Sequence, residues 1–363
     1  MTIDEAVMRA LAAVAPVRRD EALSRHTTIG IGGPADAYVT ARSAGELSGV
    51  LRVAQAAGVP VFVLGSGSNI VVGDRGIRGV VIENRASGVT SPPGPLLHGK
   101  MGDTPKPSLK EGEGEASRPE GLGVEGLARP SGSNEAPTPH PNPLPSRGEG
   151  TFGFRIESGA SFAAVARQLA FAGYAGLEWA CGIPGTLGGA VVYNAGAYGG
   201  CLGDVLQRIA VWDVGVGEVV YEAPELGLVY RGSAFTRGLM AGRAVLWADV
   251  ALWQGDIEAL KSRVADYDAR RLKAQPRGRN AGSFFKNPAG QPAWRLLDAV
   301  GLRGYRAGGA EFSDKHCNFL INAGGATAAD VMVLMSLAQD RVRERFGIEL
   351  ENEVTLVGEG FGR

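Results

Sequence analysis

The chain has 363 residues, more than one compact core usually holds, so two or three domains are expected. Its 37 Lys and Arg residues balance 38 Asp and Glu residues, which excludes binding to a nucleic-acid backbone by overall charge. The three cysteines lack the spacing of a disulfide framework or a metal site, and no apolar run reaches the length of about 18 residues that a membrane span needs. We therefore expect a globular protein of the reducing cytoplasm, without a metal, a nucleic-acid partner or a membrane anchor.

The first part of the chain combines a helix with buried strands. Ser43, followed three residues later by Glu46, is typical of a capping box and predicts a helix that ends at Gly58. The apolar runs at 61–64 and 79–83 predict buried strands.

Residues 88–150 differ in composition from the rest of the chain. They hold 12 of the 20 prolines and 12 glycines, and they include no aromatic residue. Such a segment cannot bury enough apolar surface to offset the entropy of ordering it. We expect a disordered insert, which is either a loop without activity or a Pro-rich segment that binds a partner.

Helix and strand signals alternate again after the insert, without a regular repeat. They are a helix from 161 to 173, strands at 208–213, 218–222 and 244–252, helices at 256–273 and 292–300, a strand at 318–322, a helix from 327 to 347 and a closing strand at 348–357. Residues 180–203, rich in Gly, Ala and Pro, are expected to form loops and turns. This order predicts an α+β fold.

Two glycine-rich segments are candidates for anion binding. LGSGSNI at 64–70 follows a predicted strand and can direct backbone N–H groups at a phosphate, but without a Walker A lysine or a third glycine a plain turn is the alternative. GIPGTLGGA at 182–190 allows the backbone to approach a ligand closely, and tight internal packing is the alternative there. The two together favour a long diphosphate cofactor such as FAD, held between two lobes.

Three further residues are candidates for catalysis. Arg231 in YRGSAF can stabilise an oxyanion or bind a carboxylate, although an exposed structural Arg is more common. Ser283 in NAGSFFKNP has no His close in sequence, which favours a proton donor over a nucleophile. Glu353 alternates with Glu349 and Glu351, a pattern that is most often a solvated strand face.

Six segments match one known family in order and in spacing. They are HTTIGIGGPAD at 26–36, LGSGSNIVVGDRGIRGVVI at 64–82, GLEWACGIPGTLGGAVVYNAGAYGG at 176–200, YRGSAF at 230–235, RRLKAQPRGRNAGSFFKNP at 270–288 and ENEVTLVGE at 351–359. Together they resemble the UDP-N-acetylenolpyruvoylglucosamine reductases, in the shorter, type II-like branch that lacks a tyrosine-bearing loop between Gly200 and Tyr230. The resemblance covers nearly all of the chain outside the insert.

The resemblance implies an α+β fold with a two-lobed FAD-binding domain of the vanillyl-alcohol-oxidase (PCMH) type and a C-terminal α+β substrate-binding domain. We expect lobe 1 at residues 1–87, the insert at 88–150, lobe 2 at 151–272, the substrate-binding domain at 273–350, and a terminal strand and tail with the catalytic Glu at 351–363.

The resemblance also implies an activity. In this family NADPH reduces FAD, and the reduced flavin passes a hydride to UDP-N-acetylglucosamine enolpyruvate, which yields UDP-N-acetylmuramate for peptidoglycan. We expect a cytoplasmic monomer that acts on these small molecules. The alternatives are another FAD-dependent oxidoreductase of the same FAD-binding fold, which would lack the GSFFKNP and ENEVTLVGE segments, and a catalytically silent scaffold, which would have lost the catalytic residues.

The functional residues of the family fall on defined positions of this chain. The catalytic groups are Arg231, Ser283 and Glu353: Arg231 stabilises charge on the substrate carboxylate, Ser283 delivers a proton to C2, and Glu353 acts through a bound water or orients Arg231. The cofactor-binding positions are Thr27, Gly65, Ser66, Gly67, Ser68, Asn69, Ile183, Pro184, Gly185, Thr186, Gly188 and Gly189. The substrate-binding positions are Lys273, Asn287 and His316.

Overall fold

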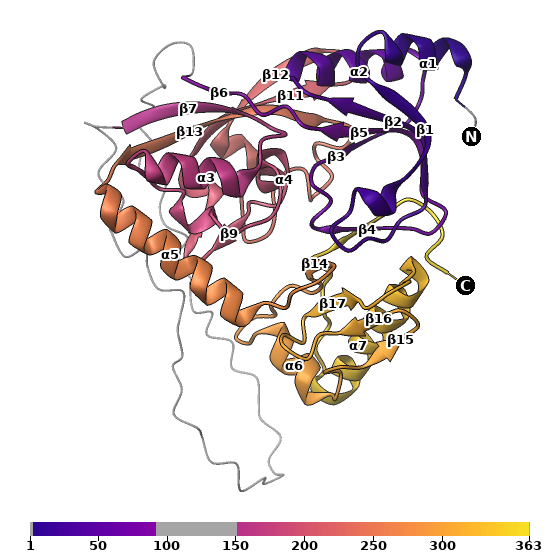
Figure 1. The fold of residues 1–363 in the computed structure, drawn as a ribbon, viewed down its shortest axis with the longest axis vertical. Helices are drawn as coiled ribbons and strands as arrows, with labels where there is room; N and C mark the ends of the chain where they lie inside the picture. The colour runs from indigo at the N-terminus through magenta and orange to yellow at the C-terminus, as the bar shows by residue number, and fades with distance from the viewer. Residues whose placement is uncertain (1–2, 92–150, 363) are drawn as a thin grey trace, which may run out of the picture.

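The computed structural model describes residues 3–91 and 151–362 of the chain. Figure 1 shows an N-terminal lobe in indigo, a second lobe in magenta to orange, and a C-terminal unit in orange to yellow. We keep the names lobe 1 for residues 3–87, lobe 2 for residues 151–272 and C-terminal unit for residues 273–350. No helix in these described ranges is both long and apolar enough to cross a membrane.

Lobe 1 is built on a four-stranded mixed sheet. Its strands, in spatial order, are β1 (Val17–Ala22), β2 (Pro34–Ala41), β5 (Ile77–Asn84) and β3 (Val61–Leu64), and its helices are α1 (Glu5–Ala12) and α2 (Ala44–Ala56). Helix α2 begins as predicted, because the Ser43 hydroxyl accepts a hydrogen bond of 3.1 Å from the backbone N–H of Glu46. Apolar residues of α2 pack on the sheet and also reach lobe 2, so the two lobes share a core.

Lobe 2 is built on an antiparallel sheet whose strands, in spatial order, are β12 (Gly217–Glu222), β11 (Leu206–Asp213), β13 (Ala244–Gln254), β7 (Thr151–Glu157) and β6 (Val89–Thr90), with β8 (Tyr174–Ala175) paired to the end of β13. Helices α3 (Phe162–Phe171) and α4 (Leu187–Val192) cover one face of this sheet, and α5 (Ile257–Ala274) leads from it to the C-terminal unit (Figure 1). A short hairpin, β9 (Gly196–Ala197) and β10 (Gly200–Cys201), follows α4.

Two predictions for this part of the chain need adjustment. Val89–Thr90 pair with β7, so the sheet extends into the range 88–150 that we predicted to be an insert, and residues 92–150 of that range lie outside the described residues. The prediction of loops and turns at 180–203 is wrong for α4. That helix forms because Thr186 caps it and because Leu187 and Val191 are buried, which outweighs the low helix propensity of glycine.

The C-terminal unit has an antiparallel sheet with two helices. The strands are β14 (Asn280–Ser283), β17 (Phe319–Asn322), β16 (Ala310–Phe312) and β15 (Arg306–Ala307), and the helices are α6 (Ala293–Ala299) and α7 (Ala328–Phe346). Its core includes three lobe 1 residues, Ile29, Ile31 and Val71. Asp74 of lobe 1 also accepts hydrogen bonds from the first backbone N–H groups of α7. The C-terminal unit is therefore attached firmly to lobe 1.

The end of the chain returns to lobe 1. Strand β18 (Thr355–Val357) pairs in parallel with β4 (Ile70–Val72), which directly follows the LGSGSNI loop. Our prediction of one strand over 348–357 is wrong in length. Residues before Thr355 bend away because they bond instead to the C-terminal unit, where Lys286 N–H donates to Glu351 O and Glu353 N–H donates to Phe284 O. This bend places Glu353 between lobe 1 and the C-terminal unit.

Candidate active site

A cavity of about 1160 Å³ lies where the two lobes and the C-terminal unit meet. It exceeds the range of about 300–1,000 Å³ that is usual for small-molecule sites, so it has room for a cofactor together with a substrate. All three predicted catalytic residues line it, as do all predicted cofactor-binding residues except Thr27. Residues far apart in the sequence thus converge on one cavity.

The two glycine-rich loops touch each other at the wall of this cavity. The Ser68 hydroxyl donates a hydrogen bond of 3.1 Å to the Pro184 carbonyl, and a Cβ on Gly65 would lie only 2.6 Å from Thr186 Oγ1. Within the described residues, nothing accepts a hydrogen bond from the backbone N–H groups of Ser66, Gly67 and Ser68. Such free N–H groups beside a large cavity fit the diphosphate of a dinucleotide.

Arg231 and Glu353 form an ion pair in the cavity wall. Arg231 Nε lies 2.9 Å from Glu353 Oε1, and both side chains are largely buried. Burial raises the pKa of Glu353, and the positive charges of Arg231 and Lys286 oppose this rise. The predicted solvated strand face is therefore wrong for Glu353, although Glu349 and Glu351 are exposed. A buried, charged Arg is well suited to bind a carboxylate in which negative charge increases during a reaction.

Ser283 ends strand β14, where it pairs with Phe319 of β17. It is partly exposed to the cavity and lies next to Gly282, whose φ of +80° turns the chain there. Lys286 and Phe319 also line the cavity. The hydroxyl is therefore accessible to a bound substrate, as a proton donor must be.

Comparisons with known proteins agree with this geometry. Residues 35–91 and 150–221 match the family profile of the FAD binding domain, and residues 274–357 match the C-terminal domain of UDP-N-acetylenolpyruvoylglucosamine reductase. The chain is 37% identical to the UDP-N-acetylenolpyruvoylglucosamine reductase of Desulfosudis oleivorans, over 94% of this chain and 95% of that one. It is 38% identical to the protein of that name from Rubrobacter xylanophilus, over 94% of this chain and 95% of the relative.

The chain belongs to the UDP-N-acetylenolpyruvoylglucosamine reductase family. The crystal structure of the reductase from Thermus caldophilus matches the fold with a TM-score of 0.66 at 30% identity, over 95% of this chain and all of that one. The predicted family and the predicted α+β fold with an FAD-binding domain are confirmed, and the protein is an FAD-dependent oxidoreductase. The FAD match is interrupted between 91 and 150, inside the segment we predicted to be an insert.

The three predicted substrate-binding residues of this family member lie outside the cavity lining. Lys273 is exposed in the last turn of α5. The Asn287 side chain accepts a hydrogen bond from the backbone N–H of Ala293, the first residue of α6. His316 packs edge-on against Phe319, and burial lowers its pKa. Their roles toward a substrate stay predictions.

Tyr193, Tyr198 and Arg271 also line the cavity, although none of them was among the predicted catalytic, cofactor-binding or substrate-binding residues. The side chain of Arg271 passes over Gly182, where an added Cβ would lie 2.8 Å from Arg271 Cδ, and burial lowers its pKa. A second cavity of about 400 Å³ shares Arg271 with the first. The only sequence signal for this residue was the basic run before Ser283.

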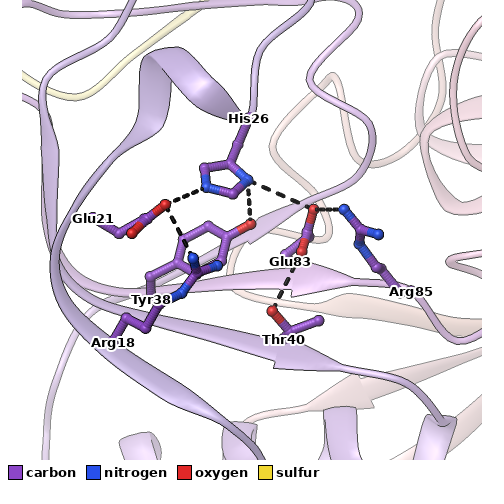
Figure 2. Close-up of polar contacts among 7 residues, drawn as sticks. All are labelled: Arg18, Glu21, His26, Tyr38, Thr40, Glu83 and Arg85. Carbon is purple, nitrogen blue, oxygen red and sulfur yellow. Dashed lines mark hydrogen bonds and ion pairs between the residues drawn. The ribbon is translucent and has the colours of Figure 1, made fainter.

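A polar network (Figure 2) holds the residues just before Thr28, whose backbone N–H donates to Gly67 O of the LGSGSNI loop. His26 lies at its centre, with Nε2 at 2.8 Å from Glu21 Oε1 and Nδ1 at 2.7 Å from the Tyr38 hydroxyl. The hydrogen bond to His26 lowers the pKa of Glu21, whereas burial raises the pKa of Tyr38. The hydroxyl of the neighbouring Thr27 donates a hydrogen bond to Ile31 O. Thr27, which we predicted to contact the cofactor, thus uses its side chain to stabilise its own turn. The network keeps the backbone of residues 26 and 27 against the loop.

Gly67→Ala is expected to weaken FAD binding at least about tenfold, because strain of about 1–3 kcal/mol must be relieved by moving the loop. Gly67 has φ +63°, and a Cβ there would lie 2.2 Å from the His26 carbonyl oxygen. The measurement is the flavin-to-protein absorbance ratio after dialysis. Gly58→Ala is the matched control, since Gly58 also has φ +63° but no atom lies within 4 Å of the added Cβ. Equal flavin retention by the two variants would contradict a role of the LGSGSNI loop in FAD binding.

Glu353→Gln is expected to gain stability relative to the native protein as the pH rises from about 4 to 8. The pKa of Glu353 is raised above its ordinary value of 4.5, so the unfolded chain releases this proton first and the native protein loses stability above that pH. Glutamine has no proton to release. The Tm of Glu353→Gln minus the Tm of the native protein, measured across this pH range, should therefore increase with pH.

Glu349→Gln is the control for this pH dependence. The hydrogen bond from Arg343 lowers the pKa of Glu349, so its contribution to stability is lost as the pH falls through the folded pKa. The Tm of Glu349→Gln minus the Tm of the native protein should therefore decrease as the pH rises. A Glu353→Gln difference that is independent of pH would show that burial does not disfavour the ionised carboxylate.

Proposed function

We propose that the chain reduces UDP-N-acetylglucosamine enolpyruvate to UDP-N-acetylmuramate with NADPH as the reductant, a step of peptidoglycan precursor synthesis in the cytoplasm. The observation that carries the proposal is the convergence of Arg231, Ser283 and Glu353 on one cavity that the two glycine-rich loops also line. The relatives from Desulfosudis oleivorans and Rubrobacter xylanophilus are UDP-N-acetylenolpyruvoylglucosamine reductases, which supports the choice of substrate. We further propose that the protein acts as a monomer.

The loops at 64–70 and 182–190 would hold FAD, whose diphosphate fits the free backbone N–H groups of Ser66, Gly67 and Ser68. When bound, FAD takes a hydride from NADPH and supplies it to the enolpyruvyl C3. We assign FAD binding to residues 1–87 and 151–272, and substrate binding to residues 273–350. Residues 351–363 bring Glu353 to the site.

Hydride addition at C3 leaves negative charge at C2 and on the adjacent carboxylate of the substrate. Arg231 is placed to stabilise this carboxylate, an effect typically worth about 3–4 kcal/mol for one donor in a catalytic site. Glu353 orients the guanidinium, since the two groups are 2.9 Å apart. Ser283 donates the proton that completes the product at C2.

The positive charges around the cavity suit an anionic nucleotide sugar. Arg271 and Lys286 line it, and Lys273 follows at the end of α5. A substrate with a diphosphate and a carboxylate needs such local charge, although the whole chain carries a net charge of −1. We propose that Lys273, Asn287 and His316 contact the part of the substrate that extends out of the cavity.

The test is an anaerobic absorption experiment on the purified protein. Oxidised flavin bands should disappear when NADPH is added and return when the enolpyruvyl nucleotide sugar follows. Return of the bands with oxygen, but not with this substrate, would refute the proposed substrate and favour another FAD-dependent oxidoreductase. Absence of bleaching by NADPH would refute the proposed reductant.

A further inference from the structure

Three consecutive residues of lobe 2 link the two segments that present Arg231 and Glu353: Val192 and Asn194 bond to the Arg231 loop, and Tyr193 bonds to the Glu353 segment. We propose that they form a clamp that keeps this pair in contact, with Tyr193 as a positioning residue for the reduction of the substrate. The proposal rests on the proposed function, because it gives the pair a role in that reaction. It assigns a role to a residue outside the predicted catalytic group.

The clamp holds the Arg231 loop at two points. The Ser233 hydroxyl donates a hydrogen bond of 2.6 Å to the Val192 carbonyl, and the Asn194 side-chain amide donates one of 3.0 Å to the Val229 carbonyl. These two bonds bracket Arg231, whose φ of +51° is uncommon for a residue with a side chain. Such a conformation persists only where the surrounding contacts enforce it.

The clamp holds the Glu353 segment through Tyr193. The Tyr193 hydroxyl shares a hydrogen bond with Thr355 Oγ1, two residues after Glu353. On the opposite side, Asn69 of lobe 1 bonds to the same segment, with its side chain donating to the Glu353 carbonyl and its own carbonyl accepting from Thr355 N–H. The terminal segment is thus fixed from both lobes.

Among the side-chain hydrogen bonds and ion pairs of the described residues, two join lobe 2 to residues 351–357: the Arg231–Glu353 ion pair and the Tyr193–Thr355 hydrogen bond. Without the Tyr193 hydroxyl, the Arg231–Glu353 ion pair would be the remaining one of these two links between lobe 2 and residues 351–357. Tyr193 lines the cavity, but its hydroxyl is engaged with Thr355. It therefore acts on the reaction through the position of Glu353.

Tyr193→Phe tests the clamp, because it removes only the hydroxyl. We expect unchanged FAD content, reduction by NADPH within about twofold of the native rate, and a fivefold to tenfold slower reoxidation by the enolpyruvyl substrate, the scale of about one neutral hydrogen bond. Thr355→Val should show the same loss, and Thr355→Ser, which keeps a hydroxyl, should restore most of the rate. Tyr221→Phe in β12 is the matched control and should change neither half-reaction.

A double-mutant cycle shows whether Tyr193 acts through Glu353. In a Glu353→Gln background, adding Tyr193→Phe should slow reoxidation by less than about a further twofold. Losses that multiply would overturn the clamp, and so would equal slowing of both half-reactions. If Tyr193→Phe loses FAD, the contrast between Thr355→Val and Thr355→Ser decides. A native enzyme that the substrate does not reoxidise would refute the proposed function, whereas a native-like Tyr193→Phe in an active enzyme would refute only the clamp.

Discussion

Ser283→Ala is expected to slow reoxidation of the reduced enzyme by the enolpyruvyl substrate at least about a hundredfold, the lower end of what a positioned proton donor contributes. Ser283 lines the cavity from the end of β14, and in the proposed reaction it donates the proton that C2 receives. A serine hydroxyl is a weak acid, but the centre that accepts its proton is strongly basic. Reduction by NADPH should stay near the native rate, because that half-reaction needs no proton at C2.

Stopped-flow absorbance of the two half-reactions measures this effect. Ser283→Cys should keep part of the activity, because a thiol can also donate a proton. Ser48→Ala is the matched control: Ser48 is a solvent-facing residue of α2 whose hydroxyl only bonds within its helix, to Gly45 O. If Ser283→Ala is reoxidised at the native rate, Ser283 is not the proton donor.

Arg231→Lys is expected to slow the same half-reaction about a hundredfold, the scale of one lost donor to a developing anion. Lysine keeps the positive charge but not the planar guanidinium, which can bind a substrate carboxylate while Nε faces Glu353 at 2.9 Å. Both side chains occupy the same left-handed backbone position, so the φ of +51° does not distinguish them. Reduction by NADPH should change less than about threefold, since no carboxylate charge develops there.

The decisive measurement for Arg231 compares how much Arg231→Lys slows each of the two half-reactions. Arg306→Lys is the control, because this exposed Arg also pairs with a carboxylate, that of Glu311, but lies outside the cavity lining. It should change neither half-reaction. Equal slowing of both half-reactions by Arg231→Lys would return Arg231 to a structural role.

Local signals in the sequence predicted the helices α2, α3, α5, α6 and α7 and marked the two glycine-rich loops. Ser43 with Glu46, and Thr327 with Asp330, marked helix starts that the structure confirms, because a cap is made between residues three positions apart. The glycine-rich loops were recognisable for a similar reason, since a chain that turns tightly next to a ligand needs glycine within a few residues. Motif order along the chain was enough to identify the family.

Tertiary structure decided what depends on residues far apart in the chain. Helix α4 formed in a glycine-rich stretch because burial of its apolar face outweighed local propensity. The alternation of Glu349, Glu351 and Glu353 predicted one solvated face, yet Glu353 faces Arg231, because its backbone bonds to the C-terminal unit before the chain joins β4. The contact between Tyr193 and Thr355 had no signal in the sequence at all. Helix caps and tight turns depend on residues close in sequence, so local patterns predict them. Which side chains meet in the cavity depends on packing between distant segments, which the sequence alone does not show.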